Sequence, residues 1–164
     1  MEKKRTWEGI GPKLALVTLP FIILSIILMQ KDPGFLKMNF LNKITGNITG
    51  YALLITGVIF YVYSAKIFFA DFKTNKLIKR GTYGLCRNPI YATFIVFIVP
   101  SLSFLFLSGM IILMDLVLYI NFKVLIHEEY DALKENFGDE YEKYKKSVNE
   151  IIPLPKFWNK SKKT

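Results

Sequence analysis

One apolar block constrains the fold of this chain more than any other feature. Residues Pro89–Phe122 carry no charged side chain except Asp115. A single helix through Ile90–Ile126 would be about 55 Å long at about 1.5 Å per residue, whereas the hydrocarbon core of a bilayer is about 30 Å thick. The block therefore has to fold back on itself, and we expect the corner at Ser108-Gly109. The sequence predicts a tight helical hairpin with almost no connector.

Two further apolar runs, Leu14–Met29 and Ile44–Ala65, precede this block and contain no charge. Hydrophobic residues make up 52% of the 164 residues, and runs of this length are typical of membrane-spanning helices. We therefore predict an all-α integral membrane protein that forms a single membrane domain over residues 1–164. Its four transmembrane helices are expected at about 14–30, 46–66, 89–107 and 109–127.

The basic residues predict the orientation of these spans. Of the 22 Lys and Arg residues, 19 fall on one side of a four-span topology and 3 on the other. Cytoplasmic loops carry the excess of positive charge, so both termini and the loop between the second and third spans are expected in the cytoplasm. We expect a prokaryotic cell membrane rather than the endoplasmic reticulum. The net charge of +9 is explained by this flanking pattern, so we expect no nucleic-acid partner.

The residues after the last span, 128–164, predict a cytoplasmic amphipathic helix and a basic tail. Aromatic and apolar residues recur at helical spacing between lysines, and Gly138 interrupts the pattern. The helix is expected to lie on the membrane surface or to cap the bundle, and the tail to contact anionic lipid. The chain has one cysteine, Cys86, which excludes an intrachain disulfide and is either a small filler or a thiolate nucleophile. We expect no metal site.

A compact polar segment, Arg80–Tyr91, lies directly before the apolar block. Its Asn88-Pro89 pair predicts a helix start, because Asn is a favoured N-cap and Pro fits the first helical position. With Arg87 beside it, this helix start suits an anionic group. A capped helix after a basic loop explains the same residues, and the two interpretations stay open.

The predicted hairpin brings two polar clusters to one membrane surface. Arg87–Tyr91 opens the third span, and His127–Glu129 closes the fourth. Neighbouring antiparallel helices would place a cation opposite carboxylates, above an apolar floor. Such a site suits a ligand that is anionic at one end and carries amines or hydroxyls at the other. It would open to the cytosol and sideways to the lipid.

Two ordered blocks of residues carry a resemblance to a known family. The first is Leu77–Tyr83 followed by Arg87–Tyr91, and the second is Glu128-Glu129 followed by Phe137–Tyr141 and Ile152-Pro153. Together they resemble the isoprenylcysteine carboxyl methyltransferases, and the related phospholipid methyltransferases share the layout. The resemblance covers nearly half the chain. It implies an integral membrane enzyme that uses S-adenosyl-L-methionine and takes a lipid-tailed or prenylated substrate from the bilayer.

The resemblance also implies a set of site residues. Those expected to bind the cofactor are Gly81, Tyr83, Arg87, Asn88, Pro89, Tyr91, His127, Glu128 and Glu129. Among them Arg87 and Glu129 are the expected catalytic residues: Arg87 would hold a carboxylate, and Glu129 would bind cofactor hydroxyls or the amine. An amine acceptor would need a base, for which His127 or a glutamate is the candidate.

One departure from the family pattern bears on the chemistry. Where the family has His, this chain has Asn88, which cannot carry a proton at neutral pH. Either that His is not a required base, or the chemistry is altered or lost. Carboxyl O-methylation of an isoprenylcysteine-like substrate is the first hypothesis, because it needs mainly positioning and removal of water. The alternatives are N-methylation of a phospholipid or other amine, a non-catalytic scaffold of the same fold, and a sterol-reductase-like enzyme that uses a nicotinamide.

Overall fold

The computed structural model describes residues 9–32, 34–72, 74 and 76–156. Within them the ordered elements are helical, and four helices are long and apolar enough to cross a membrane. The first two are α1 (Gly11–Lys31) and α2 (Lys43–Phe72), the third covers Pro89–Phe106, and the fourth begins with α5 (Gly109–Leu125). The four predicted spans are thus confirmed as helices, with α2 six residues longer at its end than expected. Their insertion into a membrane stays a prediction.

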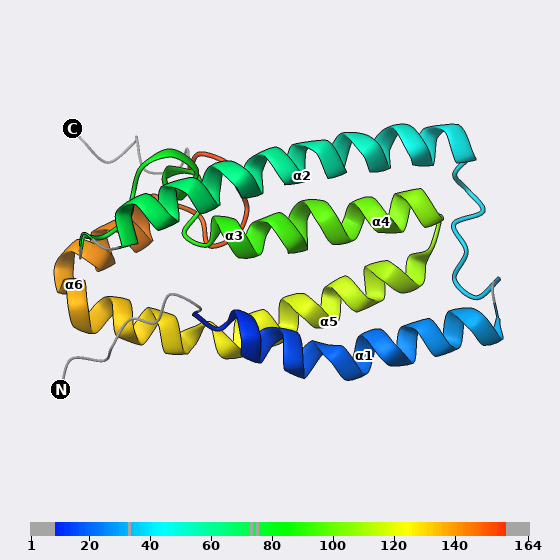
Figure 1. Cartoon of the computed structure of the whole chain (residues 1–164), viewed down its shortest axis with the longest axis horizontal. Helices are drawn as coiled ribbons and strands as arrows, with labels where there is room; N and C mark the ends of the chain where they lie inside the picture. The colour runs from blue at the N-terminus through cyan, green and yellow to red at the C-terminus, as the bar shows by residue number, and fades with distance from the viewer. Residues whose placement is uncertain (1–8, 33, 73, 75, 157–164) are drawn as a thin grey trace.

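The helices are arranged so that the hairpin lies inside and the first two spans lie outside. Figure 1 shows the order α2, α4, α5, α1 across the bundle, with α2 packed on α4 and α1 packed on α5. Glycines on α2 allow its close approach: a Cβ at Gly50 would lie 2.6 Å from Leu105 Cγ, and one at Gly57 would lie 2.7 Å from Phe97 Cβ. Small residues at helix contacts have this role in membrane proteins.

The third span is built from three consecutive helical pieces. They are α3 (Pro89–Ala92), a π-helical turn η2 (Thr93–Ile98) and α4 (Val99–Phe106). The helix start that was predicted at Pro89 is confirmed. The π-helical turn was not expected, and it ends two residues before Pro100, which has no N–H to donate to the preceding turn.

The hairpin corner lies where the length argument placed it. Leu107 adopts a left-handed conformation (φ 50°, ψ 41°) and Ser108 is extended, so the chain reverses within two residues. The corner pairs with the connector between α1 and α2: Gly109 N–H donates to the Leu36 carbonyl at 2.8 Å, and Met38 N–H donates to the Leu107 carbonyl at 2.8 Å. Both turns therefore meet at one end of the bundle.

The other end of the bundle carries most of the polar residues. Helix α6 (His127–Ser147) follows α5 directly and is broken at Gly138 (φ 46°), as predicted. Residues 148–155 then run back beside the loop before α3, where Arg87 N–H donates to the Asn149 carbonyl at 2.9 Å. A short turn η1 (Gly81–Gly84) completes this end. The membrane-surface placement that was predicted for α6 stays a prediction.

Candidate functional site

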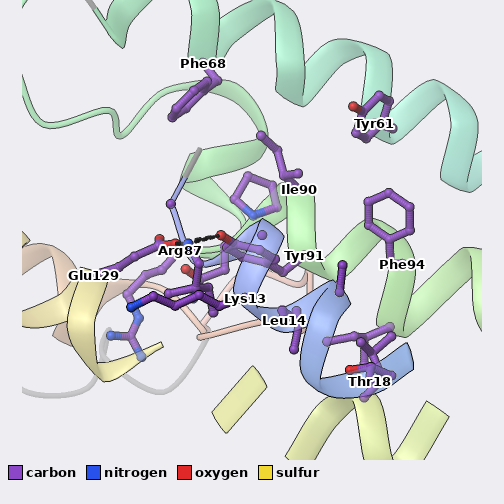
Figure 2. A pocket seen from close by; sticks show the side chains of 18 of the residues that line it. Lys13, Leu14, Thr18, Tyr61, Phe68, Arg87, Ile90, Tyr91, Phe94 and Glu129 are labelled. Atoms are coloured by element: carbon purple, nitrogen blue, oxygen red, sulfur yellow. Dashed lines mark hydrogen bonds between the residues drawn. The ribbon is translucent and has the colours of Figure 1, made fainter. Parts of the chain in front are cut away.

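A cavity of about 830 Å³ opens in the polar end of the bundle and extends between the helices. It is bounded by α1, α2, the third span, α5 and the start of α6. The polar residues at its open end include Lys13, Arg87, Asn88, Tyr91, Glu128 and Glu129, and its deeper wall includes Ile22, Tyr61, Phe94, Val99, Met114 and Leu118. In Figure 2, Glu129, Arg87 and Lys13 gather on one side, and Tyr61, Phe94 and Thr18 lie along the other. The cavity therefore has a charged end and an apolar limb.

The cavity is open at its side as well as at its polar end. Three of its aromatic lining residues, Tyr61, Phe69 and Phe94, are 40%, 62% and 41% exposed. Tyr61 of α2 and Phe94 of η2 meet edge to face, with their ring centroids 5.9 Å apart. These exposed rings lie on α2 and η2, and α1 lines the other side of the cavity. The side opening therefore lies between α1 and α2, the two outer spans. It would face lipid if the helices are inserted as predicted.

One group of residues, which we call the cavity cluster, lines the charged end. It consists of Lys13, Tyr91, Glu128 and Glu129, together with Ile10, which contributes its backbone N–H. Glu129 Oε1 accepts hydrogen bonds from the Tyr91 hydroxyl at 2.6 Å and from Ile10 N–H at 2.7 Å. The same Ile10 N–H also reaches the Tyr91 hydroxyl at 3.2 Å. Glu128 forms an exposed ion pair with Lys13. The expected approach of Tyr91 to the glutamate pair is thus present, and the start of α1 joins them.

A second group, the anchor cluster, borders the cavity at Arg87 and Asn88 and extends behind it to Lys123, Tyr130 and Glu150. Glu150 accepts hydrogen bonds from Lys123 Nζ at 2.7 Å and from the Tyr130 hydroxyl at 3.0 Å, and it lies 3.8 Å from Arg87 Nη2. The Arg87 guanidinium stacks over the Tyr130 ring at 4.8 Å. Arg87 was expected to hold a ligand carboxylate, and the carboxylate beside it in this structure belongs to the protein.

Glu150 is the polar residue of this end that the sequence analysis missed. Its side chain is largely buried, which raises the pKa of its carboxyl, but hydrogen bonds from Lys123 and Tyr130 and the charges of Lys123 and Arg87 outweigh that effect. The net result is a pKa below the ordinary glutamate value. Its sequence context, an isolated acid just before Ile151-Ile152-Pro153, contains no signal of this role.

The structure corrects the role that was predicted for Asn88. Asn88 stands at the N-cap position of α3, but its side chain makes no capping hydrogen bond. Instead Nδ2 donates to the Tyr130 hydroxyl at 2.6 Å and to the Glu150 carbonyl at 3.0 Å. Its backbone N–H also donates to that carbonyl, at 3.2 Å. Asn88 therefore attaches the C-terminal segment to the start of the third span.

The remaining expected site residues divide between the cavity and its surroundings. Tyr83 and Pro89 line the cavity. Gly81 and His127 do not: Gly81 packs on α2, where a Cβ would lie 2.3 Å from Ile67 Cδ1, and His127 is exposed on α6 with its ring edge-on to Tyr130. A base at His127 would therefore act from outside the cavity walls.

Three further buried groups lie at this end of the bundle: the Cys86 thiol, the Arg87 guanidinium and the Tyr141 hydroxyl. Cys86 is fully buried, and this burial raises the pKa of its thiol to about 12, so it is a neutral filler and not a thiolate nucleophile at physiological pH. Arg87 Nε and Nη1 are buried without a hydrogen-bond partner among the described residues. The Tyr141 hydroxyl is close enough to the Arg87 guanidinium to interact with its charge, but no hydrogen bond of good geometry joins the two among the described residues.

No protein-family model matches this chain, and no curated protein or solved structure matches it. The fold and the cavity define the class of the described part of the chain: it contains four helices long and apolar enough to cross a membrane and has an amphiphilic, laterally open cavity at its polar end.

Proposed function

We propose that this protein is an S-adenosyl-L-methionine-dependent methyltransferase that acts on a lipid-tailed acceptor, with carboxyl O-methylation of an isoprenylcysteine-like substrate as its reaction. One observation carries the proposal: residues from both motif blocks meet at the charged end of a cavity whose other limb is apolar and open at the side. Tyr91 from the first block and Glu129 from the second are joined directly by a hydrogen bond.

The residues at the charged end fit the proposed cofactor. The cavity volume lies within the range of about 300–1,000 Å³ that is usual for small-molecule sites. Glu129 uses Oε1 for its hydrogen bonds, and Oε2 makes none with the described residues, which leaves an acceptor for hydroxyl or ammonium donors. Lys13 and Arg87 supply positive charge for a carboxylate. When bound, the cofactor would supply an electrophilic methyl group.

The chain's own residues then have to position an acceptor and keep water away. In O-methylation a bond forms between an acceptor carboxylate oxygen and the methyl carbon while the carbon–sulfur bond breaks, and no proton has to be removed. This chemistry tolerates Asn88 in place of a histidine, because a carboxylate is already a nucleophile at neutral pH. The Asn88 side chain is committed to Tyr130 and Glu150, which supports a structural role for that position.

The apolar limb fits the tail of the acceptor. From Lys13 to Ile22 the wall on α1 rises through nine residue steps, or about 14 Å at about 1.5 Å per residue. This length is close to half of the bilayer core of about 30 Å, so the limb would hold a tail about one leaflet long. Met114 and Val99 lie on the same deep wall.

The experiment uses full-length protein in nanodiscs with labelled S-adenosyl-L-methionine and two acceptors, an S-prenylcysteine and a phosphatidylethanolamine, with buffer alone as the blank. We expect saturable cofactor binding and a base-labile methyl ester on the S-prenylcysteine. Glu129→Gln should weaken cofactor binding at least about tenfold, because a hydrogen bond to a charged group is worth about 1.5–3 kcal/mol. The matched control is Glu135→Gln, an exposed glutamate of the same helix that does not line the cavity.

The outcomes separate the alternatives. Methylation of the phosphatidylethanolamine amine would replace O-methylation by the N-methylation alternative, and tight binding of a nicotinamide cofactor would favour the reductase. A second candidate, a non-catalytic lipid-binding protein, is favoured by the internal hydrogen bonds that already engage Asn88 and Glu129. Binding of prenylated lipid without any binding of S-adenosyl-L-methionine would support that candidate and refute the methyltransferase.

A further inference from the structure

The residue just before α1 donates a hydrogen bond to Glu129, the carboxylate that the proposed function assigns to the cofactor. Ile10 N–H donates to Glu129 Oε1 at 2.7 Å and lies 3.2 Å from the Tyr91 hydroxyl. Ile10 is separated from these two residues by 119 and 81 positions in sequence, so this contact is tertiary. In Figure 2, the beginning of α1 passes beside the Tyr91–Glu129 hydrogen bond. A polar ligand and the Ile10 amide would compete for the same acceptor.

Gly9 makes this close approach possible. Its φ is +55°, and a Cβ built on it would lie 2.3 Å from Glu129 Oε1 and 2.8 Å from the Tyr91 hydroxyl. Any side chain here would both strain the backbone and collide with the carboxylate. Gly11 in the same segment has no atom within 4 Å of a corresponding Cβ. A glycine is therefore needed for close contact with Glu129 at position 9 and not at position 11.

The forces that hold this contact are few. The hydrogen bond to Glu129 is charge-assisted, the Lys13–Glu128 pair has side chains that are 59% and 54% exposed, and the Ile10 side chain is buried. Further along α1, Leu14 and Thr18 are its buried residues, and Thr18 accepts a hydrogen bond from Asn121. Ile10 is only 1% exposed and belongs to the hydrophobic core. Opening therefore breaks the Glu129 hydrogen bond and the Lys13–Glu128 pair and withdraws the Ile10 side chain, while Leu14 and Thr18 keep the rest of α1 packed on α5. Local opening of this kind gates sites.

We infer that residues 9–13, the turn before α1 and the beginning of its first turn, are a gate over the charged end of the cavity. The gate closes on Glu129 and Tyr91 through the Ile10 amide, and a polar ligand opens it by taking the Glu129 carboxylate. The ligand class rests on the proposed function, but the gate itself does not. Ligand binding would shift an existing equilibrium, since a ligand that takes Glu129 favours the open state alone.

The direct test is hydrogen exchange, followed by mass spectrometry, on the peptide that covers residues 9–14 of full-length protein in nanodiscs. Gly9→Ala opposes the closed state without removing a ligand-binding group, and it should speed exchange of this peptide at least about tenfold, the scale set by one lost hydrogen bond to a charged acceptor. Gly11→Ala is the matched control and should leave the rate within about twofold. Equal exchange in the two variants would overturn the gate.

A second readout measures access to the cavity. A cysteine introduced by Ala132→Cys, at a lining residue of α6, is treated with a charged maleimide, while the buried Cys86 stays in place and unreactive. Combining it with Gly9→Ala should raise the labelling rate several-fold, whereas Gly11→Ala should leave it unchanged. No increase with Gly9→Ala would contradict the gate even if that variant were partly destabilised, because destabilisation can only speed labelling.

Addition of S-adenosyl-L-methionine separates this inference from the proposed function. Faster exchange of the peptide over residues 9–14 in its presence would support both, because the ligand would have replaced the Ile10 amide. A Gly9→Ala effect without any response to S-adenosyl-L-methionine would keep the gate and remove the proposed ligand. Cofactor binding with slower exchange of that peptide would overturn the gate and keep the methyltransferase, since α1 would then close onto the ligand.

Discussion

The cavity cluster and the anchor cluster both place a glutamate among hydroxyl and cationic groups at the same end of the bundle, yet they differ in what they hold. Glu129 in the cavity cluster joins α6 to the first turn of α1 and borders open space. Glu150 in the anchor cluster joins the C-terminal segment to the third and fourth spans. The comparison teaches that a charged group near a cavity is a ligand candidate only where one of its atoms still faces that cavity.

The largest effect is expected from breaking the anchor cluster. Glu150→Ala leaves Arg87, whose side chain is only 10% exposed, without its acidic neighbour, and a buried charge that loses its partner costs about 3–5 kcal/mol. Because Glu150 itself is partly exposed, we expect about 3 kcal/mol, read as a loss of thermal stability of the protein in nanodiscs. The control is Glu142→Ala, which removes an exposed 4.0 Å pair with Lys134 and should change stability by less than about 0.5 kcal/mol. Equal effects would mean that the anchor cluster is not structural.

Acid should release the anchor cluster before the rest of the fold. The pKa of Glu150 is lower in the folded protein than in the unfolded chain, so its ionic contribution is complete above the ordinary glutamate pKa of about 4.3 and is lost as the pH falls through the lowered value. The protection factor of residues 148–155, which is the intrinsic exchange rate at each pH divided by the observed rate, should therefore fall in that acidic window. In Glu150→Gln the protection factor of the same peptide should change little with pH, and an unchanged acid response there would assign the effect to another group.

A smaller effect is expected in the cavity cluster, where Tyr91→Phe removes one hydroxyl. The hydroxyl donates to Glu129 at 2.6 Å, and its loss should cost about 1 kcal/mol of stability because Ile10 N–H still satisfies that carboxylate oxygen. Thermal unfolding gives the stability, and cofactor binding gives the functional effect. The comparison of the clusters predicts that Tyr91→Phe weakens binding more than Glu150→Gln does. The reverse order would place the ligand at the anchor cluster.

The smallest effect belongs to the ion pair at the entrance. Lys13→Ala removes the exposed contact with Glu128 and should lower stability by less than about 0.5 kcal/mol, since such pairs are solvated and screened by salt. Its rate of hydrogen exchange at residues 9–14 should rise by no more than about threefold. A rise as large as that of Gly9→Ala would show that this ion pair, and not the Ile10 amide, holds the first turn.

Much of the fold follows from local and compositional features of the chain. The block Pro89–Phe122 is too long for one span, so a reversal near Ser108-Gly109 could be predicted, and it lies at Leu107 and Ser108. Gly138 broke the pattern of α6 as expected. The approach of Tyr91 to Glu129 followed from the hairpin. The contact with Ile10 could not be predicted, because it depends on where α1 packs and uses a backbone N–H that every residue but proline has.

By itself the sequence determined four apolar spans, a hairpin in the last two, and the meeting of two polar segments at one end, because span length and charge distribution act along the chain. The tertiary structure alone decided which of those polar groups face a cavity. It paired Arg87 and Asn88 with Glu150 at the edge of the cavity, and it bound Glu129 to the residue that precedes α1. The physical reason is that partner choice among buried charges depends on distance and burial, and only the packed helices set these two quantities.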